Sequence, residues 1–321
     1  MGRRAGLTLA ALATVGVLVL VGLAVLRGTG PLAGPLRGAD RCLAEVDGHE
    51  VELGVEQAEN AALIVAISQQ RGMPARAATI ALATAYQESK ILNIEHGDRD
   101  SVGLFQQRPS QGWGTVEEIL DPVFATNAFY DALENVDGYR SMEVTDAAQA
   151  VQRSAFPQAY ADHEQDARVL ASALTGHSPE SFWCVIAGEH STSTSRLNKA
   201  GLVPRAAAVR SELDALFGAP LGGFEPRGVS SGHMSGSAHY AGRAIDAFVR
   251  PVNAGNRRRG WAIAHYLVAQ ADRLAIRTVI FDDRIWQAGR GGWRDYRVPS
   301  SSSGDQSILE HRDHVHVDVA P

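Results

Sequence analysis

The chain has 321 residues, of which 45% are hydrophobic and 21% are charged, a composition typical of a globular protein rather than a disordered one. This length is sufficient for two domains of ordinary size. The formal net charge of -6, together with the lack of basic runs interleaved with aromatic residues, argues against nucleic acid as a partner.

The N-terminal segment is strongly apolar. From Ala5 to Leu26 the chain carries no charged residue, and Arg3 and Arg4 precede this stretch. As a helix it would span about 33 Å, enough for a bilayer core of about 30 Å. Residues 1–27 are therefore predicted to be a single-pass membrane anchor, with the rest of the chain outside the cytoplasm. The alternative is a cleaved signal peptide and a secreted protein, although signal peptides usually have a shorter apolar region.

Residues 28–40 are rich in glycine and proline and predict a linker. Beyond them, apolar residues recur at helical spacing in several segments, which predicts a mainly α-helical domain over 41–187. The predicted helices span residues 55–72, 74–90, 121–136, 146–154 and 166–176.

Serine, threonine and glycine replace the apolar pattern over residues 188–201, which predicts a second linker. A second domain over 202–321 then mixes both kinds of periodicity. Its predicted helices span 205–218 and 260–275, and its predicted strands span 276–281 and 314–319. The predicted fold class is therefore multidomain, with an α-helical domain and an α+β domain behind one transmembrane helix.

Cys42 and Cys184 are the only two cysteines, and they lack the spacing of a zinc or redox motif. Outside the cytoplasm, where disulfides persist, they are predicted to pair and to tie together the two ends of the first domain. The alternative is two buried free thiols.

Glu88 lies at the end of an apolar predicted helix and is followed by a polar turn. A carboxyl group beside apolar walls has a raised pKa, because loss of solvent disfavours the anion, and can then act as a general acid. Cleavage of a glycosidic bond requires such an acid. The Glu-Ser pair, followed by the motif SVGLFQ at 101–106, resembles the soluble lytic transglycosylase and goose-type lysozyme family.

This resemblance implies that Glu88 is the catalytic acid of an enzyme that cuts the glycan strand of peptidoglycan. It also implies that Ser101 and Gln106 shape the cleft and bind substrate. One carboxylate suffices when the substrate's N-acetyl group assists the reaction. A hydrolase would need a second, for which Asp98 and Asp100 are available, although an Asp-Arg-Asp sequence is commonly plain turn chemistry. The family's YNxG-type segment is not evident in the chain.

A second group of polar residues lies in the C-terminal part. In HVHVDV, at 314–319, strict alternation places His314, His316 and Asp318 on one face of a strand and the valines on the other. Asp246 lies in an apolar predicted strand, where an unpaired carboxylate would be costly. Two imidazoles, one carboxylate and a water form a common open zinc site.

The sequence SAHYAGRAID at 237–246, followed by the C-terminal HVH, resembles the metallopeptidase superfamily that contains D-Ala-D-Ala carboxypeptidases, murein endopeptidases and the Hedgehog signalling domain. The resemblance implies an antiparallel sheet and a zinc ion bound by His239, Asp246 and His316.

The same resemblance implies roles for three neighbouring residues. His314 would be the catalytic histidine and His311 a supporting one, whereas Asp313 stands where the carboxypeptidase branch has its general base. The choice between Asp313 and His314 stays open. His233 and His265 are interpreted as structural, since a lone histidine is commonly packed rather than ligating.

Both resemblances point to peptidoglycan as the partner and substrate. The predicted function is a peptidoglycan-remodelling enzyme with a zinc cofactor, which cleaves glycan strands, wall peptides or both. The alternative is a non-catalytic wall-binding or signalling protein that retains the form of the two sites.

Overall fold

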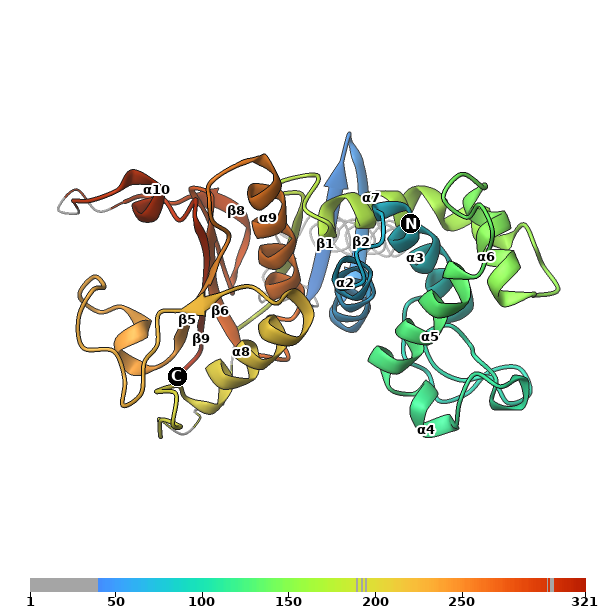
Figure 1. The fold of residues 1–321 in the computed structure, drawn as a ribbon, viewed down its shortest axis with the longest axis horizontal. Helices are drawn as coiled ribbons and strands as arrows, with labels where there is room; N and C mark the ends of the chain where they lie inside the picture. The colour runs from blue at the N-terminus through green and yellow to red at the C-terminus, as the bar shows by residue number, and fades with distance from the viewer. Residues whose placement is uncertain (1–39, 189, 192, 194, 299, 301–302) are drawn as a thin grey trace, which may run out of the picture. The chain divides into compact units, whose positions relative to one another are not determined.

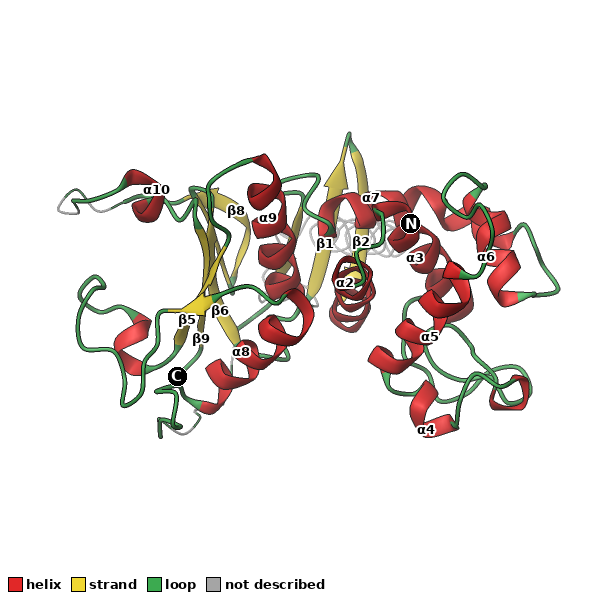
Figure 2. Ribbon diagram, in the orientation of Figure 1, coloured by secondary structure: helices red, strands yellow, loops and turns green. Residues whose placement is uncertain are grey.

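The computed structural model describes residues 40–188, 190–191, 193, 195–298, 300 and 303–321. Asp40–Pro321 forms one compact unit of helices and two antiparallel sheets (Figures 1 and 2). None of the helices in these residues is both long enough and apolar enough to cross a membrane.

The predicted fold class is corrected accordingly: the described residues form helices and two antiparallel sheets, with no transmembrane helix among them. The long helices of the described part carry polar side chains among their apolar ones, as in α2, where Glu56, Gln57 and Glu59 fall within the first two turns. Such helices bury one face in a protein core. The stretch Ala5–Leu26, on which the membrane prediction was based, lies outside the described residues.

The N-terminal part begins with a β-hairpin that the sequence analysis missed. β1 (Arg41–Val46) and β2 (His49–Gly54) are joined by Asp47 and Gly48, which both have positive φ. Asp-Gly is a favoured pair for such a two-residue hairpin turn. β3 (Phe182–Val185) pairs with the other edge of β1, giving a three-stranded sheet in the order β2-β1-β3.

The predicted disulfide is confirmed. Cys42 of β1 and Cys184 of β3 lie directly opposite each other in the antiparallel register and are bonded. The bridge closes a loop with a sequence separation of 142 residues and joins the first strand of the described chain to the strand that follows its helical region.

The helices of this part are α2 (Val55–Gln70), α3 (Ala75–Ser89), α4 (Val116–Ile119), α5 (Pro122–Glu134), α6 (Val144–Gln152) and α7 (Glu164–Leu174), with short 3-10 helices η1 (Pro109–Gln111) and η2 (Ala159–His163). The five longer helices agree with the predicted ones to within a few residues, whereas α4 and the two 3-10 helices were not predicted. α3 is almost wholly buried and packs against α2, α6 and α7. The buried α3 carries Glu88 at its C-terminal end.

The C-terminal part is built on a six-stranded antiparallel sheet in the order β4-β5-β9-β6-β7-β8. Its strands are β4 (Leu221–Gly222), β5 (Ala244–Phe248), β6 (Ile276–Phe281), β7 (Arg284–Gln287), β8 (Arg290–Asp295) and β9 (His314–Val319). Its helices are α8 (Pro204–Phe217), η3 (Ala238–Ala241), α9 (Ala254–Ala269) and α10 (Gln306–Leu309). The strands predicted at 276–281 and 314–319 are confirmed.

α9 begins earlier than predicted. Asn253 caps it by accepting a hydrogen bond from the Asn256 N–H, so the polar stretch that follows forms the first turns of the helix. α8 and α9 pack on one face of the sheet (Figure 1), and the buried valines of β9 belong to the same hydrophobic core as these helices. The opposite face of β9 carries His314 and His316.

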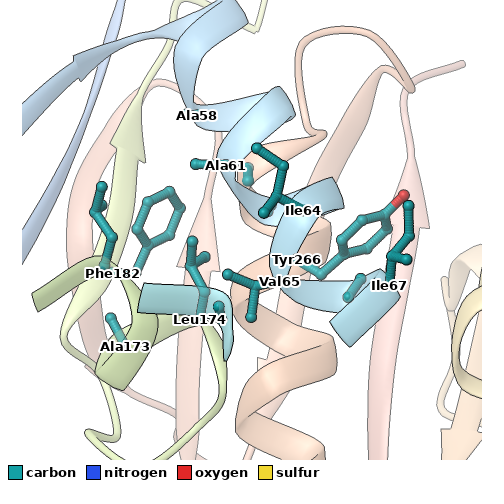
Figure 3. Packing of buried hydrophobic residues seen from close by; sticks show 14 of the residues in the cluster. Ala58, Ala61, Ile64, Val65, Ile67, Ala173, Leu174, Phe182 and Tyr266 are labelled. Atoms are coloured by element: carbon teal, nitrogen blue, oxygen red, sulfur yellow. The ribbon is translucent and has the colours of Figure 1, made fainter. Parts of the chain in front are cut away.

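One hydrophobic core runs through both parts. α2 packs against α9, and Figure 3 shows Ile64 and Val65 of α2 near Tyr266 of α9, Leu174 of α7 and Phe182 of β3. The side-chain amide of Gln270 also donates a hydrogen bond to the Glu59 carbonyl at 2.9 Å. The helical part and the larger sheet thus support each other in one compact unit.

Candidate functional site

The C-terminal cluster is assembled by the two central strands β5 and β9. Asp246 stands directly opposite His316 in their antiparallel register, so the two side chains emerge on the same face. His239 reaches this point from η3, which precedes β5. All three side chains are buried, with exposed fractions between 2% and 9%.

The distances within this group match a metal site. His239 Nε2 lies 3.1 Å from His316 Nδ1 and 3.3 Å from Asp246 Oδ1, and the last two atoms are 3.0 Å apart. Ligands bound tetrahedrally to zinc at 2.0–2.1 Å are separated from each other by about 3.3 Å. The three atoms are therefore spaced as the ligands of one zinc ion would be.

Further hydrogen bonds orient the two imidazoles. His239 Nδ1 lies 2.6 Å from the carbonyl oxygen of Gly223, which places the proton on Nδ1 and leaves the Nε2 lone pair toward the cluster. His316 turns its Nε2 toward Asp318 at 3.7 Å and its Nδ1 toward Asp246. Burial opposes protonation of His316, but the bonds to Asp246 and Asp318 outweigh it and raise its pKa to about 9. The position thus attracts positive charge.

His314 is fixed beside the cluster by a chain of charged groups. Its Nδ1 lies 2.6 Å from Asp313 Oδ1, while Asp313 Oδ2 accepts from Arg250 Nε at 2.6 Å. Its Nε2 points toward Asp246, 3.8 Å from Oδ1. Burial acts to raise the pKa of Asp313, but the bonds from His314 and Arg250 lower it overall. Both oxygens of Asp313 are engaged, so the geometry favours His314 as the proton carrier and Asp313 as its orienting partner.

His311 also lies in this group, with its ring 4.7 Å from that of His314 and edge-on to Tyr296 at 4.9 Å. Its buried Nδ1 has no hydrogen-bond partner among the described residues. Burial lowers the pKa of His311 to about 3, so the ring stays neutral. The arrangement suits the supporting role that the resemblance implies.

The sequence analysis interpreted His233 as structural, whereas the structure places it beside the cluster. A ligand atom of His233 lies within 4.8 Å of ligand atoms of both His239 and Asp246, and its ring stacks on that of His239 at 3.9 Å. The loop that carries it has no periodicity to reveal this position. His265, by contrast, packs as interpreted: it is fully buried in α9, and its Nδ1 lies 2.8 Å from the Ala173 carbonyl.

A cleft of about 680 Å³ surrounds the cluster. It is lined by the histidines and Asp246, by the loop around His233, and by side chains of β6 such as Thr278 and Ile280. A cleft of this size admits a peptide-sized ligand.

The second candidate position is Glu88, at the C-terminal end of α3. Its Oε1 accepts a hydrogen bond from the Tyr160 hydroxyl of η2 at 2.7 Å. Burial raises the pKa of Glu88, and the bonds from Tyr160 and Gln152 act in the opposite direction without cancelling that effect. The side chain is thus suited to carry a proton at a pH where an ordinary glutamate has lost it. Tyr160 is a further residue that the sequence analysis missed, because 72 positions separate it from Glu88.

The side chains of Ser101 and Gln106 form hydrogen bonds within the loop that follows Glu88. Ser101 Oγ donates to the Asp98 carbonyl at 2.7 Å and lies 3.1 Å from Gln106 Oε1. The two side chains leave no room at Gly97, where an added Cβ would lie 1.8 Å from Gln106 Oε1. Ser89 Oγ donates to the Leu104 carbonyl at 2.8 Å and so ties this loop to the end of α3. The role of Ser101 and Gln106 in binding substrate stays a prediction.

The two aspartates considered as a second carboxylate are placed differently. Asp100 accepts from Arg108 Nε at 2.7 Å and from the Ser110 N–H at 2.8 Å, and the Ser110 bonds, followed by the Arg108 bond, hold its pKa well below the ordinary value. Asp98 is almost fully exposed. Asp100 therefore organises the loop, as the turn interpretation proposed.

Comparison with known families gives one match. Residues 198–306 match the family described as "VldE, C-terminal domain". This range includes His239 and Asp246, whereas His316 follows it. No curated protein matches the chain.

Proposed function

We propose that the protein is an enzyme of peptidoglycan remodelling that cleaves wall peptides with a zinc ion bound by His239, Asp246 and His316. The observation that carries this proposal is the spacing of the three buried ligand atoms, 3.0 to 3.3 Å from one another. The resemblance of the surrounding motifs to wall metallopeptidases supplies the substrate class.

The protein's own residues have distinct tasks in this proposal. Zinc, when bound, lowers the pKa of a water ligand and polarises the scissile carbonyl. His314, held by Asp313, moves a proton at Nε2 on the side of Asp246. The side chains of the cluster are themselves buried in the wall of the cleft, which limits their contact with bulk water.

A second activity is supported by Glu88. The raised pKa of its buried carboxyl group and its bond to Tyr160 suit a general acid that protonates the leaving oxygen of a glycosidic bond. With Asp100 engaged by Arg108, the transglycosylase route, in which the substrate's N-acetyl group assists, is favoured over hydrolysis by two carboxylates.

The disulfide supports a location outside the cytoplasm. Cys42 and Cys184 are bonded, and such bridges persist in oxidising compartments where the wall is also found.

Metal content and peptide cleavage, measured together, test the zinc proposal. Asp246→Ala should lose both, because it removes a ligand and leaves the two imidazoles without their carboxylate. His314→Ala should retain zinc and lose turnover. A wild-type protein that stays free of zinc after zinc addition would contradict the proposal, as would an Asp246→Ala variant with full metal content.

A further inference from the structure

The loop at 228–237 brings a fourth candidate ligand to the metal cluster. A ligand atom of His233 lies within 4.8 Å of ligand atoms of His239 and Asp246. This loop leads directly into η3 and then β5, the elements that supply those two residues. Unlike His239, Asp246 and His316, His233 comes from neither a strand nor a helix.

The backbone of His233 is held in place from both sides by one tyrosine. The Tyr240 hydroxyl accepts a hydrogen bond from the His233 N–H at 3.1 Å and donates one to the His233 carbonyl oxygen at 2.5 Å. Tyr240 follows His239 directly, so the clamp and a metal ligand belong to the same short helix η3. These hydrogen bonds therefore fix the position of the loop relative to His239.

The side chain of His233 is packed into the cluster. Its ring stacks on that of His239, with 3.9 Å between centroids and 18° between planes. Since the backbone is already fixed by Tyr240, only the side chain has to adjust for a ring nitrogen to bind the ion. The neighbouring Ser235 is exposed and makes no comparable contact with the cluster.

We propose that His233 is an additional protein ligand of the zinc ion, one that takes the place of the catalytic water and must be withdrawn before peptides are cleaved. Structural zinc sites have four protein ligands, whereas catalytic sites keep one position open. With His233 bound the site is of the closed type, and with His233 released it is of the open type. The inference rests on the zinc site of the proposed function.

Three glycines give the loop the means to release His233. Gly228, Gly232 and Gly236 all have positive φ, a conformation that side chains rarely adopt. At Gly232 and Gly236 an added Cβ would meet no atom within 4 Å, so these positions are open to solvent rather than packed. The histidine is therefore held by Tyr240 and by stacking, not by a packed loop.

Zinc alone is the probe for the test. The zinc dissociation constant is measured by competition with a chelator, and the number of bound imidazoles by X-ray absorption, for the full-length wild type and for His233→Ala. We expect zinc binding to weaken by at least ~10-fold and one imidazole to be lost, in line with the dependence of metal sites on their supporting groups. Peptide cleavage at saturating zinc should rise, because the open position is then free.

Two further variants serve as controls. Ser235→Ala changes the same loop without touching the cluster and should leave zinc affinity unchanged. Tyr240→Phe keeps the imidazole but releases its backbone, and should give a weakening between those of the other two variants. If wild type and His233→Ala have the same zinc affinity and the same number of bound imidazoles, the inference is overturned. The zinc site itself stands in that case if Asp246→Ala still abolishes zinc binding. Zinc binding that does not depend on Asp246 would overturn the proposed function as well.

Discussion

The carbonyl oxygen of Gly223 determines which nitrogen of His239 faces the candidate metal site. A side chain at this position is excluded, since an added Cβ would lie 2.3 Å from the His239 ring and 2.8 Å from Asp246 Oδ2, and φ is +77°. The carbonyl acceptor and the space for the ligands thus depend on one glycine. Its place directly after the short edge strand β4 gave no sequence signal for this role.

Gly223→Ala should weaken zinc binding by about 10- to 100-fold, because it displaces two ligands and the group that orients one of them. Gly138→Ala is the matched control: it also has positive φ, +76°, but its Cβ would meet nothing within 4 Å, and it lies in the helical part of the chain. Isothermal titration with zinc compares the two. Equal losses in both variants would show that backbone strain, rather than displacement of the ligands, is responsible.

Tyr160 adjusts the proton affinity of Glu88. Its hydrogen bond lowers the pKa that burial raises, so Tyr160→Phe should raise the pKa of Glu88 further. Glycan cleavage requires the protonated acid and falls as pH rises through this pKa. The alkaline limb of the pH-activity profile should therefore move to higher pH in Tyr160→Phe.

Tyr139→Phe, which removes a buried hydroxyl elsewhere in the helical region, should leave that limb in place. A movement of the limb to lower pH in Tyr160→Phe would contradict the assignment of Glu88 as the acid.

Among the helices and strands, the sequence predicted those whose apolar periodicity is visible within a short segment. The alternation in 314–319 correctly placed His314 and His316 opposite the valines, and the long helices were found from their apolar spacing. The hairpin at 41–54 was missed although its Asp-Gly turn was a signal. The start of α9 was missed because its first turns are polar and exposed.

Contacts between distant elements were beyond the reach of such patterns. Tyr160 meets Glu88 only because η2 packs on α3, and His233 meets His239 only through the fold of an aperiodic loop. The family resemblances supplied the candidate ligand set, but they did not supply these two neighbours.

The disulfide between β1 and β3 should contribute strongly to the free energy of unfolding. For a loop with a sequence separation of 142 residues, the chain-entropy model gives about 4 to 5 kcal/mol of stabilisation. The Cys42→Ala, Cys184→Ala double variant should therefore lower the free energy of unfolding by an amount of this order, as measured by denaturation in urea. An unchanged midpoint would mean that the packing of β1 and β3 alone sets their stability.

For the whole molecule, the shared core makes the two candidate sites parts of one folded unit. α2 of the helical region packs on α9, which in turn covers the sheet that carries His316. Glu88 and the candidate metal site are thus built on elements that stabilise one another. In the proposed function, the two sites act on one polymer that contains both sugars and peptides.

Digestion of purified peptidoglycan, followed by mass spectrometry of the fragments, tests this account most directly. The zinc-loaded wild type should release fragments with cut peptides, which Asp246→Ala should fail to produce. Anhydro-sugar ends should be lost in Glu88→Gln and kept in Asp246→Ala. Intact wall after incubation with folded, zinc-loaded wild type would contradict the account and would favour a wall-binding or signalling protein instead.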